Sequence, residues 1–179
     1  MLISKKHLDL YEPEFMGLVE QRIYSLFTEK AAKEARGTTV FLSHKHNERS
    51  VLEKVVRLLK KIGVIVYLDW LDDEMPESTS GETAERIKEK IKENRKFILL
   101  ATNGAISSKW CNWELGYGDS DKYPNNIAIM PITENDGSWV GNEYLQIYPV
   151  IKTEYDNFIG DYYVEFKDKR IKFIDWLKS

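Results

Sequence analysis

The stretch KFILLATNGAISSKWCNWELGYG, residues 96–118, decides the fold class of this chain. It begins with a largely apolar run at residues 96–103, which is typical of a strand buried on both faces of a sheet. The serine pair 107–108 then offers side-chain oxygens that favour the start of a helix. We expect this helix to cover residues 110–117 and to end where Gly118 releases the chain. The stretch therefore predicts a buried strand followed by a helix.

Apolar runs alternate with helical patterns from residue 38 onward. Further strands are expected at residues 38–43, 64–69, 127–132 and 145–151. Continuous apolar strands that alternate with helices form parallel sheets covered on both faces, so we expect an α/β protein. The predicted architecture is a flavodoxin-like, doubly wound parallel sheet of about five strands.

The segments between these strands space their apolar residues as helices do. The helix after the first strand is expected to bury Val51, Val55, Leu58, Leu59 and Ile62. The helix after the second strand should begin with a capping box made by Thr79 and Glu82. In the tail, a short strand is expected near residues 162–166, before a last helix with Ile171, Ile174 and Leu177 on one side.

Residues 1–36 differ from the rest because they are polar and helix-prone. After Pro13, apolar residues between 15 and 27 trace a helical stripe, and Gly37 ends the pattern. We predict a helical N-terminal extension over residues 1–36 and a main domain over residues 37–179. The extension is expected to pack on the main domain or on another copy of it.

Composition describes an ordinary globular chain of 179 residues, 42% hydrophobic and 31% charged. A net charge of -3 gives no electrostatic case for nucleic-acid binding. The single cysteine, Cys111, excludes an internal disulfide and is expected to be a small buried hydrophobe. Neither a membrane-spanning run nor the apolar run of a signal peptide is present, so we expect a cytoplasmic protein without membrane contact.

The candidate functional residues follow from the predicted sheet. In doubly wound sheets, ligands bind beyond the carboxyl ends of the strands. The residues expected there are Ser43, His44, Asp69, Trp70, Thr102 and Asn103. On the helix that follows, Trp110 and Glu114 are four residues apart and therefore share one face. Trp113 faces another side of that helix and is expected to be structural.

Several common chemistries find no support at these positions. The chain has neither of the glycine-rich phosphate-binding motifs that open Rossmann and P-loop domains, and no serine elbow of a hydrolase. A phospho-receiver would need clustered acids after the first strand, where residues 43–46 read Ser-His-Lys-His. His44 and His46 have no cysteine or acidic partners at metal-ligand spacing, so no metal site is predicted.

The pair of Glu114 and Trp110 suits a different reaction. Cleavage of an N-glycosidic bond builds positive charge on the ribose ring, as glycoside hydrolysis does. A desolvated carboxylate can stabilise that charge, and an indole can stack on a planar, cationic leaving group. This pair therefore favours chemistry at a nucleoside bond.

Several motifs make the chain resemble a bacterial Toll/interleukin-1 receptor (TIR) domain. They are VFLSH at residues 40–44, VYLDWLDDEMPESTSGETA at 66–84, KFILLATN at 96–103 and SSKWCNWELG at 107–116. The second of these covers a strand and the long loop that TIR domains call the BB loop. Many TIR domains have Pro-Gly in this loop, whereas this chain has Met75-Pro76-Glu77.

The resemblance implies cleavage of NAD+ as a substrate, with no further cofactor. It implies that Glu114 is the catalytic glutamate, that Trp110 lines the pocket, and that Ser43 and His44 contact the nucleotide. The products would be nicotinamide and either ADP-ribose or a cyclic ADP-ribose isomer. Free bacterial TIR proteins of this layout resemble the sensor component of Thoeris anti-phage systems, which signals to a separate effector protein.

Two other classes of function stay open. Many TIR domains are non-catalytic modules that assemble through TIR–TIR contacts at the BB loop. A third alternative is a transferase that passes a nucleotide derivative to a nucleoside acceptor. The assembly module and the enzyme are compatible hypotheses, because TIR enzymes often complete their active site with a loop from a neighbouring copy. We expect the stretch around Glu114 to be half of a site, closed by a second copy's BB loop.

Overall fold

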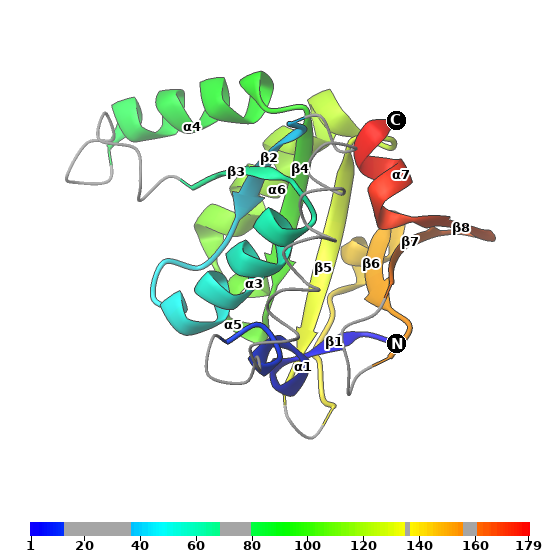
Figure 1. Ribbon diagram of the computed structural model, residues 1–179. Helices are drawn as coiled ribbons and strands as arrows, with labels where there is room; N and C mark the ends of the chain where they lie inside the picture. The colour runs from blue at the N-terminus through cyan, green and yellow to red at the C-terminus, as the bar shows by residue number, and fades with distance from the viewer. Residues whose placement is uncertain (13–36, 69–79, 135–136, 156–160) are drawn as a thin grey trace.

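A single sheet organises the described part of the chain. The computed structural model describes residues 1–12, 37–68, 80–134, 137–155 and 161–179. Within these residues one sheet holds eight strands in the order β3-β2-β4-β5-β6-β7-β8, with β1 paired to β5 (Figure 1). The strands are β1 Ile3–Ser4, β2 Thr39–Ser43, β3 Ile65–Tyr67, β4 Lys96–Ala101, β5 Ile127–Thr133, β6 Val150–Thr153, β7 Tyr162–Phe166 and β8 Lys169–Lys172.

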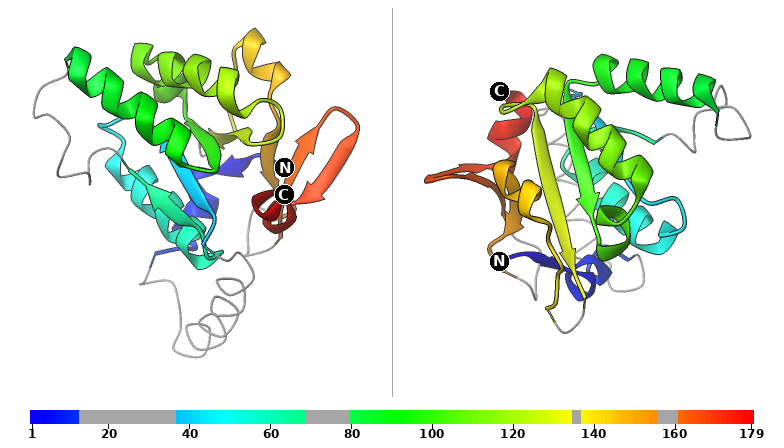
Figure 2. Two further views of the ribbon diagram at one scale, coloured as in Figure 1. Left: turned by 90° about the horizontal axis from the view of Figure 1, so that it is seen from above. Right: turned by 180° about the vertical axis from the view of Figure 1, so that it is seen from behind.

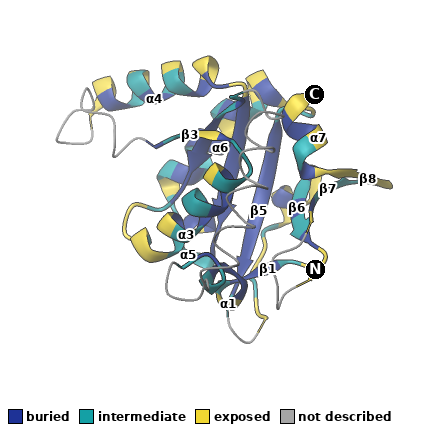
Figure 3. Cartoon of the chain, in the orientation of Figure 1, coloured by how far each residue is buried: buried dark blue, intermediate teal, exposed yellow. Residues whose placement is uncertain are grey.

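The strands β3, β2, β4, β5 and β6 are parallel, and their order confirms the predicted doubly wound α/β core. Every residue of β4 and β5 is buried, as Figure 3 shows for the middle of the sheet. The continuous apolar runs in the sequence arise for this reason, because helices cover both faces of these strands.

The helices divide between the two faces of the sheet (Figure 2). They are α1 Lys5–Asp9, α3 Arg49–Lys61, α4 Gly81–Glu93, α5 Asn103–Ile106, α6 Lys109–Lys122 and α7 Phe173–Lys178, with a 3-10 helix, η3, at Glu143–Ile147. One core lies between the sheet and α1, α3 and α7, and the other between the sheet and α4, α5, α6 and η3. Among the described residues, no helix is long and apolar enough to cross a membrane.

Helix α6 begins as predicted but ends later. The Ser108 side chain accepts a hydrogen bond from the Cys111 amide and caps the helix. The helix continues through Gly118 to Lys122, so the prediction that Gly118 ends it was wrong. Gly118 is buried against the Phe97 ring of β4, and a Cβ atom built there would lie 2.9 Å from Phe97 Cδ2. This glycine allows close helix–sheet packing rather than a left-handed turn.

Two details of the surrounding helices differ from prediction. Helix α3 buries Leu52 together with the predicted Val55, Leu58 and Leu59, while Val51 and Ile62 are only partly buried. Helix α4 has its capping box at Ser80 and Thr83, one residue later than predicted. The Ser80 hydroxyl oxygen accepts a hydrogen bond from the Thr83 amide. Glu82 lies in the first turn of α4 but takes no part in the capping box.

The C-terminal region departs most from prediction. The segment expected as a strand at residues 145–151 forms η3 first, and β6 begins only at Val150. The predicted strand near residues 162–166 is β7, and it pairs antiparallel with β8, which was not predicted. Ile171 was expected on the last helix, but it belongs to β8 and is 42% exposed. Helix α7 instead buries Phe173, Trp176 and Leu177.

Residues 1–12 lie against the sheet. Strand β1 pairs with the end of β5, with Ile3 opposite Ile132, and α1 packs on α3. The Tyr162 hydroxyl of β7 lies 2.6 Å from His7 Nε2 and 2.5 Å from the Tyr11 hydroxyl, and all three side chains are buried. The predicted apolar helix between residues 15 and 27 lies outside the described residues. The division of the chain at residue 36 stays a prediction.

The turn between β7 and β8 allows a stability prediction. Lys167 has a φ of 53° and is, in the described part of the chain, the one non-glycine residue with positive φ. Replacing Lys167 by glycine should relieve about 1 kcal/mol of left-handed strain, partly offset by the greater freedom of the unfolded chain. We expect thermal unfolding to show a net stabilisation of about 0.5 kcal/mol. The matched change Asp168→Gly, where φ is not positive, should destabilise the protein, and equal effects of the two would contradict this interpretation.

Candidate active site

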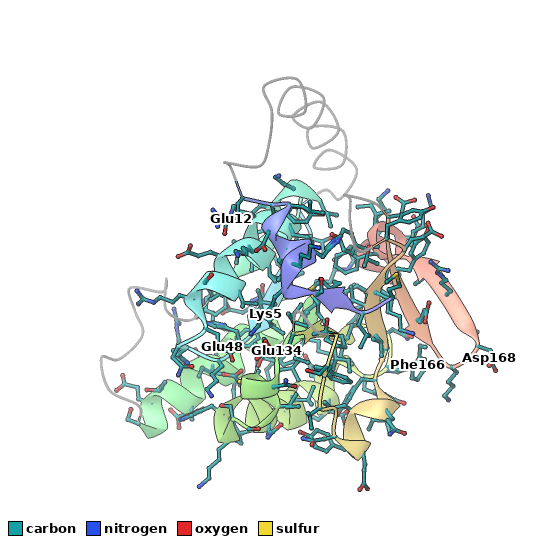
Figure 4. All side chains as sticks on the ribbon, turned by 90° about the horizontal axis from the view of Figure 1, so that it is seen from below. Lys5, Glu12, Glu48, Glu134, Phe166 and Asp168 are labelled. Atoms are coloured by element: carbon teal, nitrogen blue, oxygen red, sulfur yellow. The ribbon has the colours of Figure 1, made fainter. Side chains whose placement is uncertain are left out.

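The carboxyl ends of the parallel strands form the edge where a ligand was expected. Figure 4 views the molecule from the end at which β5 ends, and labels Glu48, Lys5 and Glu134 there. The Lys5 ammonium lies 2.7 Å from a Glu134 carboxylate oxygen, which links α1 to the end of β5. Beside β5 at this edge, β4 leads into α5 and α6, and β2 leads into the loop before α3.

The structure brings Ser43 and Glu114 together. The Ser43 hydroxyl, at the end of β2, donates a hydrogen bond of 2.5 Å to Glu114 Oε2 on α6. The two side chains are almost fully buried, with exposed fractions of 1% for Ser43 and 3% for Glu114. A buried carboxylate is costly unless polar groups solvate it, and Ser43 supplies one such group. This arrangement places a buried carboxylate, in a low-dielectric environment, next to the carboxyl end of β2.

Of the other predicted site residues, the structure describes His44 and Trp110. His44 is buried, and its Nδ1 lies 2.9 Å from the Leu42 carbonyl oxygen, which can only accept, so Nδ1 carries the proton. Trp110 is half-buried one turn before Glu114, with its ring edge-on to Trp113 at a centroid distance of 5.3 Å. Asp69 and Trp70 were also predicted, and they lie outside the described residues, as does the BB loop through residue 79.

Two contributors to this edge were missed in the sequence. Trp139 lies beyond β5, and its indole Nε1 donates a 2.7 Å hydrogen bond to the Ala101 carbonyl at the end of β4. Glu48 lies beyond β2 and accepts a hydrogen bond of 2.5 Å from the Thr102 hydroxyl. Neither residue belongs to a recognisable spacing pattern, because each makes its hydrogen bond to a residue that is distant in sequence and that only the fold brings close.

Cys111 is buried in the core beside the Glu114 carboxylate, as expected of a small hydrophobe. Burial, together with the nearby charge of Glu114, raises the pKa of the thiol to about 11. Because the thiolate is the reactive form, the thiol should be inert at neutral pH.

We expect native protein at pH 8 to react with a thiol reagent at least about 100-fold more slowly than protein unfolded in denaturant. Absorbance of the released chromophore measures both rates, and the unfolded sample provides the count of one thiol per chain. Rapid labelling of the native protein would contradict the buried, protonated thiol.

Metal ions in proteins are held by sets of His, Cys, Asp and Glu side chains. In the ranges that the structure describes, no group of three or more His, Cys, Asp or Glu side chains could hold a metal ion. His44 and His46 lie with ring centroids 5.5 Å apart, but no carboxylate or thiol completes a ligand set with them among these residues. A buried carboxylate in a water-poor position can stabilise a neighbouring positive charge more strongly than it could in bulk water.

Comparison with known proteins identifies the same region. The sequence model of the TIR domain family matches residues 40–157. The chain is 27% identical over 147 residues to the probable 3' cyclic ADP-D-ribose synthase ThsB' of Bacillus cereus (strain MSX-D12), an alignment that covers 78% of this chain and 75% of that protein. It is 28% identical over 81 residues to the putative cyclic ADP-D-ribose synthase TIR2 of Cytobacillus dafuensis, covering 44% of this chain and 21% of that protein.

The matched region runs from within β2 through β6 and contains Ser43, His44, Trp110 and Glu114. It covers well over half of the chain, and the strand order found here is that of a doubly wound α/β domain. On these grounds, the chain belongs to the TIR domain family.

Proposed function

We propose that this chain cleaves the bond between nicotinamide and ribose in NAD+, with Glu114 as the catalytic residue. The observation that carries the proposal is the buried Glu114 carboxylate, held by the Ser43 hydroxyl at the carboxyl edge of the sheet. Support also comes from the two relatives, which are named as probable and putative cyclic ADP-D-ribose synthases.

The proposed reaction breaks the bond between ribose C1′ and the pyridinium nitrogen. The bonding electron pair leaves with nicotinamide, which becomes neutral, and positive charge spreads over C1′ and the ring oxygen. The Glu114 carboxylate would stabilise this oxocarbenium-like state by a charge interaction that is absent in the ground state of a neutral ribose. Water then adds to C1′ and releases a proton, which gives ADP-ribose.

The remaining residues would bind and orient the dinucleotide. Trp110, one turn from Glu114, offers an indole face on which the cationic nicotinamide ring can stack. Ser43, at the end of β2, would hold the carboxylate in place, and the next residue, His44, would contact the nucleotide. Asp69 and Trp70, which follow β3 in the sequence, complete the proposed set of substrate-binding residues.

The product would be a cyclic ADP-ribose isomer if a nucleophile of the ADP-ribose itself, rather than water, attacks C1′. The names of the relatives favour this outcome. A cyclic product would serve as a signal to a separate effector protein in anti-phage defence, as the resemblance to Thoeris sensors implies. Attack by an internal hydroxyl or adenine nitrogen conserves atoms, since the attacking group loses one proton and no water is consumed.

The direct test is to incubate the purified chain with NAD+ and to follow nicotinamide by chromatography and the second product by mass spectrometry. ADP-ribose contains one water more than a cyclic ADP-ribose, so the product masses separate hydrolysis from cyclisation. Release of nicotinamide with one of these two products is the expected result. Protein that leaves NAD+ intact at every concentration and in assembled form would refute the proposal and favour the non-catalytic module.

Self-association is part of the same proposal. If a second copy's BB loop completes the site, nicotinamide release per chain should rise with protein concentration, whereas a complete monomeric site gives a constant rate per chain. Chromatography with light scattering over the same concentration range would relate any rise to assembly.

A further inference from the structure

Glu48 joins two loops at the proposed site. It stands immediately before α3, where a polar side chain commonly caps its own helix, but it makes no such cap. Its carboxylate instead accepts the hydrogen bond of 2.5 Å from the Thr102 hydroxyl, across 54 positions of sequence. Figure 4 shows Glu48 at the carboxyl edge of the sheet. We call this contact the Glu48–Thr102 bridge.

The backbone beneath the bridge is shaped to admit it. A Cβ atom built on Gly104 would lie 2.2 Å from Glu48 Oε1 and 3.0 Å from Lys45 Cδ. The Glu48 carboxylate therefore packs directly against the backbone of α5 at Gly104, where the absence of a Cβ atom leaves room for it. A side chain at Gly104 would force the Glu48 carboxylate to move from this position.

The bridge is close to the proposed catalytic pair. Ser43 and Glu48 mark the two ends of the loop between β2 and α3, and Ser43 donates its hydrogen bond to Glu114. Pairing of β2 with β4 fixes one end of this loop, and the Glu48–Thr102 bridge ties the other end to the residue that follows β4. Burial is the main cause of the raised pKa of the Cys111 thiol, and the charges of Glu114 and Glu48 add to it. Both carboxylates therefore lie close enough to Cys111 to act on the same side chain electrostatically.

From this geometry we propose that Glu48 is a positioning residue, whose bridge to Thr102 holds the loop that follows Ser43, and that begins with His44, in its place at the proposed site. The proposal rests on the proposed function and extends it to a residue that does not touch the reacting atoms. Misplacement of a loop at an active site lowers the rate of the chemical step, because the reacting groups spend less time in productive geometry.

A double-mutant cycle tests this role. We expect Glu48→Ala and Thr102→Val each to lower kcat about 10-fold with a smaller change in KM, and the double variant to lose no more than either single one. Glu48→Gln and Thr102→Ser keep an acceptor and a donor, so they should stay within about 3-fold of wild type. Losses that multiply in the double variant would overturn the bridge as a unit.

Glycine variants provide an independent arm. Gly104→Ala should reproduce the loss of kcat seen in Glu48→Ala, because its Cβ occupies the place of the Glu48 carboxylate. Gly116→Ala is the matched control, since nothing lies within 4 Å of its Cβ position, and its kcat should equal that of wild type. Equal activity of the Gly104 and Gly116 variants would contradict the proposal.

Hydrogen exchange separates this inference from the proposed function. The Glu48 amide donates to the Lys45 carbonyl at 3.0 Å, and the Ala105 amide donates to Thr102 Oγ1 at 2.9 Å. In Glu48→Ala, both segments should exchange at least about 5-fold faster than in wild type, with core strands unchanged. Unchanged exchange would refute the bridge even in an active enzyme. An inactive wild type with accelerated exchange in the variant would refute the reaction and leave only a structural bridge.

Discussion

Replacing Glu114 by glutamine is expected to lower nicotinamide release by about 100-fold or more. Glutamine has the same shape and can still accept the hydrogen bond from Ser43, but it carries no charge to stabilise the oxocarbenium-like state. Because a buried charge is costly, its removal should leave the thermal unfolding midpoint unchanged or raise it. Loss of activity without loss of stability is the signature of a catalytic charge, and chromatography of nicotinamide with thermal unfolding measures both.

Two variants make this prediction specific. Glu89→Gln is the same chemical change on α4, where the side chain is 62% exposed, and it should leave activity unchanged. Ser43→Ala removes one hydrogen bond to the carboxylate and should lower the rate by about 10-fold. A Glu114→Gln variant that keeps more than about a tenth of wild-type activity would exclude Glu114 as the catalytic residue.

The second large effect is on stability. Gly118→Val should destabilise the protein by about 2 kcal/mol, because its Cβ would lie 2.9 Å from the ring of Phe97. Phe97 is fully buried in the central strand β4, so neither the ring nor the strand can move aside cheaply. Denaturant unfolding monitored by fluorescence or circular dichroism measures the change.

Gly116 provides the matched control for this prediction. It lies two residues earlier on the exposed side of α6, where an added Cβ meets no atom within 4 Å. Alanine at this position should stabilise the helix by about 0.5–1 kcal/mol, because glycine is a poor helix former. If Gly118→Val were tolerated as well as Gly116→Ala, the close packing of α6 on β4 would be disproved.

The parts of the fold that burial dictates could be predicted from the sequence. Strands β4 and β5 are buried throughout, so their residues form continuous apolar runs that identify them. Strand β8 has no such signal, because all four of its residues are exposed and it is held by pairing with β7. Gly118 was misread because glycine ends helices and also permits close packing, and only the neighbouring Phe97 ring distinguishes the two.

Local spacing predicts where the candidate residues stand in the fold, while their roles stay a prediction. Helical periodicity puts Trp110 and Glu114 on helix α6, and Ser43 was expected at the end of a buried strand, where the structure has it. The contact between Ser43 and Glu114 spans 71 positions and depends on which strands are neighbours. Glu48 could not be found, since an isolated glutamate before a helix is usually solvated, and its contact with Thr102 exists only through loop geometry.

Strand β8 bears on how the chain behaves at high concentration. It forms an outer edge of the sheet, where unpaired backbone groups could template the addition of another strand. Three of its four residues, Lys169, Arg170 and Lys172, are basic, and all four are exposed. A second copy approaching edge to edge would align like charges along the whole strand. The charges on β8 therefore disfavour aggregation by edge-to-edge strand pairing. We expect this protein to assemble through surfaces other than the β8 edge.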